Sequence, residues 1–145
     1  MVVMKRIAVF LAMVMTFLTI GSCSKDKPEN DGTGNLVGDW QMMDVTFNTK
    51  SAVIGGMTVT VYLRLSKDGS FGMWQQLGQG RFNSFTGTWS YSKGVLSGIY
   101  SDGNKWGSEY EVTLKENFLT MTALPDRMDV YSYSRCTIPD SVESQ

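Results

Sequence analysis

The chain has 145 residues, a formal net charge of −1 and no histidine. The balanced charge and the lack of a basic patch argue against nucleic acid as a partner. Without histidine a Ser–His or Cys–His nucleophile pair is excluded, and the two cysteines are too few for a zinc cluster, so we expect no catalysis, no metal and no cofactor.

Residues 1–22 are typical of a secretory signal peptide. Lys5 and Arg6 precede an uncharged run over Ile7–Ile20, which is too short for the ~20 apolar residues of a membrane-spanning helix. The tetrapeptide Ile20-Gly21-Ser22-Cys23 that follows resembles the lipobox of bacterial lipoproteins. The resemblance implies that the chain is cleaved before Cys23 and anchored to a membrane by acyl chains on this residue. The alternatives are a membrane-spanning helix and an ordinary signal peptide in which Cys23 has no role.

Residues 23–35 are expected to form a flexible tether. After Cys23 this segment contains polar residues, glycines and one proline, so it cannot bury enough apolar surface to order itself. Ser24, directly after the cysteine, is compatible with sorting to the outer membrane of Gram-negative bacteria. The expected location is therefore the outer membrane, on its periplasmic or its cell-surface face.

From Leu36 onward apolar and polar residues alternate with a period of two, which is typical of half-buried strands. The clearest example is Met57–Leu65, and the Asp68-Gly69 pair that follows it is a strong hairpin signal. No segment after Cys23 has a helical period. The predicted strands are Val37–Phe47, Met57–Leu65, Phe71–Leu77, Phe85–Tyr91, Val95–Tyr100, Trp106–Leu114, Phe118–Leu124 and Met128–Arg135.

About eight short strands joined by tight polar turns indicate an all-β domain, which could be a meander, a barrel or a sandwich. Closure removes the two exposed edges of a sheet. We therefore expect an antiparallel up-and-down eight-stranded barrel over residues 36–136, followed by a C-terminal tail at 137–145. A barrel of about eight strands is either filled by its side chains or holds one small ligand, and the bulky inward residues favour a largely filled interior.

Three fragments resemble a known family. Leu36-Val37-Gly38-Asp39-Trp40 is similar to the opening Leu-x-Gly-x-Trp segment of lipocalin-like domains. Phe85–Tyr91 resembles their Gly-x-Trp strand in the middle of the domain, and Leu119-Thr120-Met121 resembles their late leucine-threonine-leucine element. Such domains occur in many small lipoproteins of Gram-negative gut and oral anaerobes. The resemblance covers residues 36–135 and implies a lipocalin-like barrel.

The resemblance also implies roles for five residues. Gly38 and Gly87 would let the chain bend or let another backbone approach, and Trp40 and Trp89 would fill the barrel, with a tryptophan plugging one end. Arg135, from the last strand, would pack against Trp40 in a cation–π contact. The chain is shorter than secreted lipocalins and lacks their C-terminal helix and disulfides, so a ligand is not inherited from the resemblance.

Four aromatic residues are candidates for a binding pocket. Tyr62, Trp74, Tyr100 and Trp106 fall on or near strands whose inward face the sequence does not fix. Pointing inward near an open end, they would form a pocket for an apolar or sugar-like ligand. Otherwise they are core or solvent-facing side chains.

Cys136, with Cys23 lipidated, has no partner for a disulfide within the chain. We expect a buried, inert thiol, and the alternative is an intermolecular or reactive thiol.

We therefore expect a lipid-anchored, lipocalin-like barrel that binds a small apolar or amphipathic molecule without catalysis. The alternative is a structural or interaction module with a filled interior that docks to another protein of the cell envelope. The first predicts a cavity inside the barrel, and the second predicts a contiguous apolar patch on the surface.

Overall fold

The computed structural model describes residues 33–43, 52–54 and 56–145. Over these residues the chain forms nine strands in one antiparallel sheet and two helices of four residues each. The predicted signal peptide, Cys23 and most of the predicted tether lie outside the described residues. The elements are α1 (Thr33–Leu36), β1 (Gly38–Met43), β2 (Ala52–Ile54), β3 (Met57–Leu65), β4 (Ser70–Leu77), β5 (Asn83–Ser92), β6 (Val95–Tyr100), β7 (Glu109–Lys115), β8 (Phe118–Leu124), β9 (Val130–Arg135) and α2 (Asp140–Glu143).

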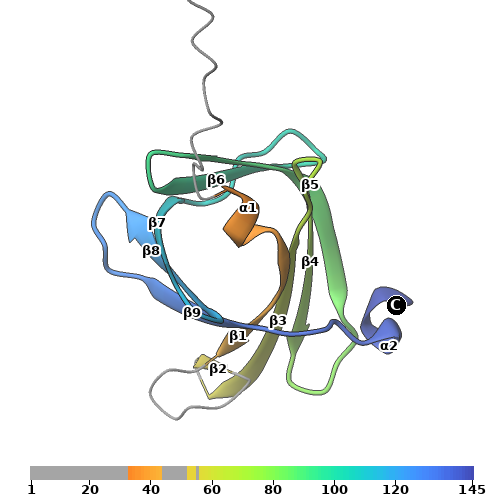
Figure 1. Cartoon of the computed structure of the whole chain (residues 1–145). Coiled ribbons are helices and arrows are strands. Elements are labelled where there is room, and N and C mark those ends of the chain that lie inside the picture. The colour runs from red at the N-terminus through yellow and green to blue at the C-terminus, as the bar shows by residue number, and fades with distance from the viewer. Residues whose placement is uncertain (1–32, 44–51, 55) are drawn as a thin grey trace, which may run out of the picture.

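The sheet closes into a barrel because β1 pairs with both β3 and β9 (Figure 1). Trp40 on β1 stands opposite Leu63 on one side and Arg135 on the other. From β3 to β9 each strand pairs with the next strand in the chain, so eight of the strands form an up-and-down barrel, and β2 pairs with β3 beyond it. The predicted all-β, eight-stranded antiparallel barrel is confirmed.

Alternation along the strands decides which side chains face the interior. On β3, Val61, Leu63 and Leu65 belong to the buried core, and Leu65 has no exposed surface. One end of the barrel, which we call the closed end, is filled with large side chains. In Figure 1, α1 lies within the ring of strands. The buried residues of the closed end are Leu36, Trp40, Trp89, Leu96 and Leu119.

Three of the eight predicted strands have the predicted bounds, the other five differ at one or both ends, and β2 was not predicted. β7 begins at Glu109 rather than at Trp106, because the preceding residues turn back onto β6. The Trp106 amide donates to the Gly98 carbonyl at 2.9 Å, and the Tyr100 amide donates to the Asn104 carbonyl at 2.7 Å. In the described chain β6 and β7 therefore pair at two positions, Val95 with Glu111 and Leu96 with Tyr110.

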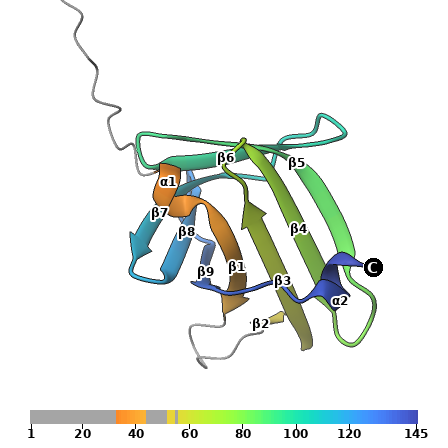
Figure 2. The same ribbon diagram turned by 45° about the vertical axis from the view of Figure 1, so that its right-hand side comes forward.

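The last nine residues pack on the outside of the barrel beside β3 and β4, where Figure 2 shows α2. Ile138 and Val142 are 3% and 4% exposed because they cover Tyr62 on β3. The sequence does not signal this helix, since four residues are too few to show a helical period. Neither helix in the described part of the chain is long and apolar enough to cross a membrane.

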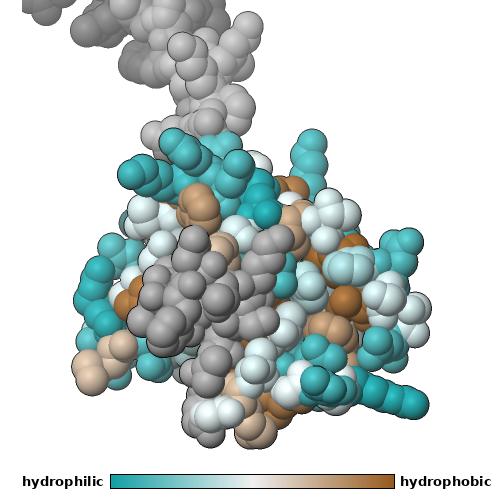
Figure 3. Space-filling model, turned by 90° about the horizontal axis from the view of Figure 1, so that it is seen from below, coloured by the Kyte–Doolittle hydropathy of each residue, from teal (hydrophilic) through white to brown (hydrophobic). Residues whose placement is uncertain are grey.

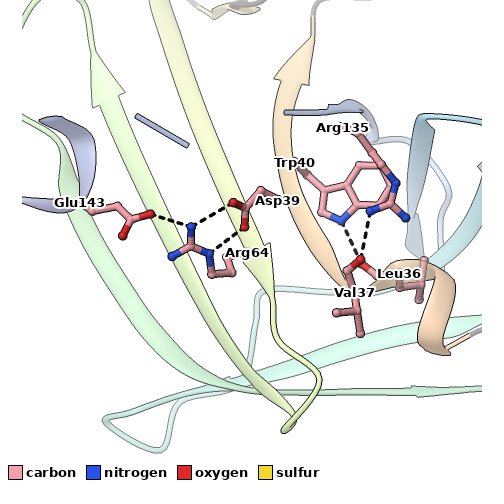
Figure 4. Close-up of polar contacts among 7 residues, drawn as sticks. All are labelled: Leu36, Val37, Asp39, Trp40, Arg64, Arg135 and Glu143. Carbon is pink, nitrogen blue, oxygen red and sulfur yellow. Dashed lines mark hydrogen bonds and ion pairs between the residues drawn. The ribbon is translucent and has the colours of Figure 1, made fainter. Parts of the chain in front are cut away.

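An ion-pair network joins α2 to the barrel (Figure 4). The guanidinium of Arg64 binds both carboxylate oxygens of Asp39, at 2.7 and 2.9 Å. It also donates to Glu143 on α2 at 2.6 Å. These two carboxylates hold the pKa of Arg64 above its usual value, mainly through the hydrogen bond to Asp39. The Arg64 guanidinium is therefore bound by two carboxylates of its own chain.

Candidate functional site

The closed end is anchored by two tryptophan side chains that bind the backbone. Trp40 Nε1 donates to the Leu36 carbonyl at 2.9 Å. Trp89 Nε1 donates to the Ser66 carbonyl at 3.0 Å. Both indoles therefore keep their hydrogen bonds although they are buried, and this end of the barrel is fixed by polar as well as apolar contacts.

Arg135 completes the closed end (Figure 4). Its Cζ lies 4.2 Å from the centroid of the Trp40 ring, which is the geometry of a cation–π contact. The guanidinium also donates to the carbonyl of Val37 at 3.0 Å and to the carbonyl of Asn35. The arginine thereby joins the last strand to the chain that enters the first.

Both glycines of the Gly-x-Trp segments occupy places that a larger residue could not. Gly38 has a φ of 140°, and a Cβ there would lie 2.4 Å from Arg135 Nη1. A Cβ on Gly87 would lie 2.0 Å from the carbonyl oxygen of Ile99. The glycines let the arginine and the neighbouring strand approach this closely.

The barrel contains a cavity of about 250 Å³ beside this closed end. Among the described residues no charged side chain lines it, and six of the thirteen lining residues are valine, leucine or methionine. Six of the described lining residues have polar side-chain atoms: Gln75, Tyr100, Trp106, Tyr110, Tyr131 and Tyr133. The cavity is therefore apolar with a few polar groups that could orient a bound molecule.

The aromatic residues of the wall contact one another edge to face. Ring centroids are 6.2 Å apart for Trp106 and Tyr110 and for Tyr110 and Tyr131. Burial raises the pKa of the Tyr110, Tyr131 and Tyr133 hydroxyls above their usual value. These three phenols therefore keep their protons at physiological pH and bring no charge to the cavity.

The structure separates the four aromatic residues that the sequence grouped as a candidate pocket. Tyr100 and Trp106 line the cavity. Tyr62 and Trp74 do not, because they stand opposite each other on the outer face of β3 and β4. On β3, Tyr62 alternates with residues that point inward, so its side chain points outward. We call this group the outer cluster, and its members are Tyr62, Trp74, Phe82, Cys136, Ile138 and Val142.

Three tyrosines of the wall were not among the predicted ligand residues. Tyr131 and Tyr133 are two residues apart on β9, so they share one face, and this spacing could have identified them. Tyr110 lies on β7, where its ring contacts those of Trp106 and Tyr131. The Cys136 side chain is partly buried in the outer cluster, away from the cavity. Among the described residues, no group of three or more metal-ligating side chains is placed to hold a metal ion.

The chain is therefore a closed up-and-down β-barrel with one plugged end and an internal cavity. A sequence model described as a lipocalin-like domain matches residues 36–121, more than half of the chain. The chain belongs to the lipocalin-like domain family. The match includes both Gly-x-Trp segments and ends before β9. A search of curated proteins gives no match to this chain.

Proposed function

We propose that the chain is a membrane-anchored lipoprotein whose barrel binds one small apolar or amphipathic molecule and catalyses no reaction. The cavity of about 250 Å³ carries this proposal, because no charged side chain of the described residues lines it. In another protein a cavity of about 150 Å³ is sufficient to bind benzene. The cavity here is therefore large enough for a compound of one or two rings.

The anchor in this proposal is Cys23. The basic residues, the apolar run and the lipobox-like Ile20–Cys23 support cleavage and lipidation. Acylation with more than one chain would make the attachment stable. Ser24 supports the outer membrane as the destination, with the barrel on its periplasmic or cell-surface face.

The cavity supports a binding protein over a docking module with a filled interior. The large apolar residues that are exposed lie on several different strands and loops, as Met57, Phe118 and Met128 illustrate. On the face shown in Figure 3, hydrophobic residues are interspersed with hydrophilic ones. A docking surface of the predicted kind would instead be contiguous.

Native mass spectrometry of the protein purified from its own source tests the binding proposal. We expect a small molecule that remains bound in the gas phase and is released on unfolding. A protein partner in stoichiometric amount, with no small molecule, would support the docking module instead.

Membrane fractionation tests the anchor separately. Cys23→Ala should release the protein from membranes or leave its precursor unprocessed, whereas Cys136→Ala should remain membrane-bound and serves as the matched control. Membrane attachment that is unchanged in Cys23→Ala would contradict the anchor.

A further inference from the structure

The junction between β6 and β7 has the fewest paired residues in the barrel wall. In the described chain these two strands pair at two positions, whereas each of the other seven junctions of the barrel pairs at four to seven. Past Leu96 the wall is continued by residues 104–107, which we call the return segment and which fold back toward β6. Local opening is easiest where few backbone hydrogen bonds must break, so this junction is the part of the wall most able to open.

A hollow of about 580 Å³ lies on the outside of this junction. Thr88, Ser90 and Ile99 line it, and all three are exposed on the outer face of β5 and β6. The barrel cavity lies on the inner side. Among the described residues, Trp106 and Gly107 are the two that line both the cavity and the outer hollow. These two residues of the return segment therefore separate the cavity from the outer hollow.

Two backbone hydrogen bonds join the return segment to β6. The Trp106 amide donates to the Gly98 carbonyl at 2.9 Å, and the Tyr100 amide donates to the Asn104 carbonyl at 2.7 Å. At the far end of the segment, a Cβ on Gly107 would meet nothing within 4 Å. The glycine leaves the backbone free to rotate at this point. The segment can thus leave β6 by breaking two hydrogen bonds and turning about Gly107.

The hydrogen bonding of the Trp106 side chain favours such a movement. Trp40 and Trp89 each donate to a backbone carbonyl, and moving either indole would break that bond. Trp106 is 8% exposed, and its Nε1 has no acceptor among the described residues. A buried donor without a partner has lost its hydrogen bond to water, and it regains that bond when it returns to solvent. For Trp106 this gain offsets part of the cost of exposing the ring.

We infer that a ligand enters and leaves the cavity sideways, through the junction between β6 and β7, when the return segment moves away from β6 and carries Trp106 with it. The inference rests on the proposed function and gives the route to the same site. The route crosses the wall of the barrel, so it needs no opening at the closed end, which large buried side chains fill. Trp106 is a positioning residue here, because its ring closes the wall over the cavity.

A reversible disulfide across the junction tests the inference. Ile99 and Lys105 are partners in an antiparallel bridge, and the two hydrogen bonds of the return segment flank them. They therefore form a non-hydrogen-bonded pair, whose Cα atoms are about 4.5 Å apart, within the range of a disulfide. Ile99→Cys with Lys105→Cys, in a Cys136→Ala background, should fix the return segment to β6 when oxidised and free it when reduced. Thr113→Cys with Thr120→Cys joins opposite residues of β7 and β8 and is the matched control.

The rates of ligand exchange are measured by stopped-flow fluorescence with 2-naphthol, a two-ring compound that is uncharged at pH 7. In the Ile99→Cys/Lys105→Cys protein, oxidation should slow association and dissociation at least about tenfold relative to the reduced form. The dissociation constant should stay within about twofold, because the disulfide blocks the route and leaves the cavity unchanged. In the control protein both rates should be the same in the oxidised and the reduced form.

Hydrogen exchange measured by NMR tests the opening without any ligand or variant. In the unaltered protein, the backbone amide and the indole N–H of Trp106 should exchange through local opening. They should therefore exchange faster than the corresponding protons of Trp89, which lies at the closed end. In the Ile99→Cys/Lys105→Cys protein, oxidation should remove this difference.

The outcomes separate this inference from the proposed function. Binding of 2-naphthol with equal rates in the oxidised and reduced forms overturns the route but leaves the binding proposal standing. Exchange of the Trp106 protons that is no faster than that of the Trp89 protons overturns the opening of the junction. Failure of 2-naphthol to bind in either form overturns the inference together with the proposed function.

Discussion

Arg135 lies over Trp40 at the closed end of the barrel, with its Cζ 4.2 Å from the ring centroid. The two residues also stand directly opposite each other where β9 pairs with β1. The contact therefore forms at the seam where the last strand meets the first. Because Arg135 also binds the carbonyl of Val37, one side chain stabilises both the seam and the chain that enters the barrel.

Substitutions of Arg135 and Trp40 should each lower the free energy of unfolding, and their two effects should not be additive. Arg135→Lys keeps the charge but loses the planar guanidinium, and it should lower the free energy of unfolding by about 1–2 kcal/mol. Trp40→Phe removes the hydrogen bond to Leu36 and should cost about 2 kcal/mol or more. Urea denaturation of both single variants and the double variant should give a coupling energy of about 0.5–2 kcal/mol. Strict additivity would contradict a direct contact.

Gly98 should tolerate no side chain, because Trp106 occupies the space. Gly98→Ala should lower the free energy of unfolding by about 1–3 kcal/mol, since the new Cβ would lie 2.2 Å from Trp106 Cε2. Gly107→Ala is the control, as a Cβ there meets nothing within 4 Å, and its effect should stay within about 0.5 kcal/mol. Chemical denaturation followed by tryptophan fluorescence measures both, and equal effects would argue against the packing described.

Stability should fall at alkaline pH because of the buried tyrosines. Burial holds the pKa of Tyr133 well above its usual value of 10.0, so above about pH 10 the unfolded chain loses this proton while the folded chain retains it. The unfolded state then binds fewer protons, and the free energy of unfolding decreases as the pH rises. This term is absent below pH 10.

Tyr133→Phe should weaken that alkaline loss by up to about 1.4 kcal/mol for each pH unit above 10. Urea denaturation between pH 8 and pH 11.5 measures the slope for the two proteins. The same slope in both would show that Tyr133 ionises as readily in the folded barrel as in the unfolded chain.

The attachment of α2 should depend on apolar burial more than on its ion pair. Val142→Ala removes two buried methyl groups and should cost about 1–2 kcal/mol. Glu143→Gln breaks an ion pair with Arg64 that is partly exposed, and it should cost less than about 1 kcal/mol. Urea denaturation compares the two variants. A larger cost for Glu143→Gln would reverse this ranking.

Most of the barrel could be predicted from the sequence because alternation and turn residues are local signals. Met57–Leu65, Val95–Tyr100 and Phe118–Leu124 form strands with the predicted bounds. The late start of β7 depends on hydrogen bonds between residues 98–100 and 104–106, and no local pattern shows such a pairing. The burial of Ile138 and Val142 likewise depends on a distant strand.

The candidate site could be predicted only in part, for a related reason. The alternation of apolar and polar residues divides a strand into two faces, but it does not show which face other elements cover. Tyr100 and Trp106 line the cavity, whereas Tyr62 is buried on the outer face by the C-terminal residues. Trp106 Nε1 has no hydrogen-bond acceptor among the described residues, and this depends on three-dimensional packing that the sequence does not show.

A variant that fills the cavity tests whether a small molecule is bound there. Val61→Phe adds a ring at the cavity wall, whereas Thr113→Phe adds the same ring at an exposed position on β7. Native mass spectrometry of the two variants and the unaltered protein, all purified from the same source, should show a bound small molecule in the unaltered protein and in Thr113→Phe but not in Val61→Phe. A bound molecule that persists in a folded Val61→Phe protein, or no bound molecule in any of the three, would show that the cavity is not the binding site.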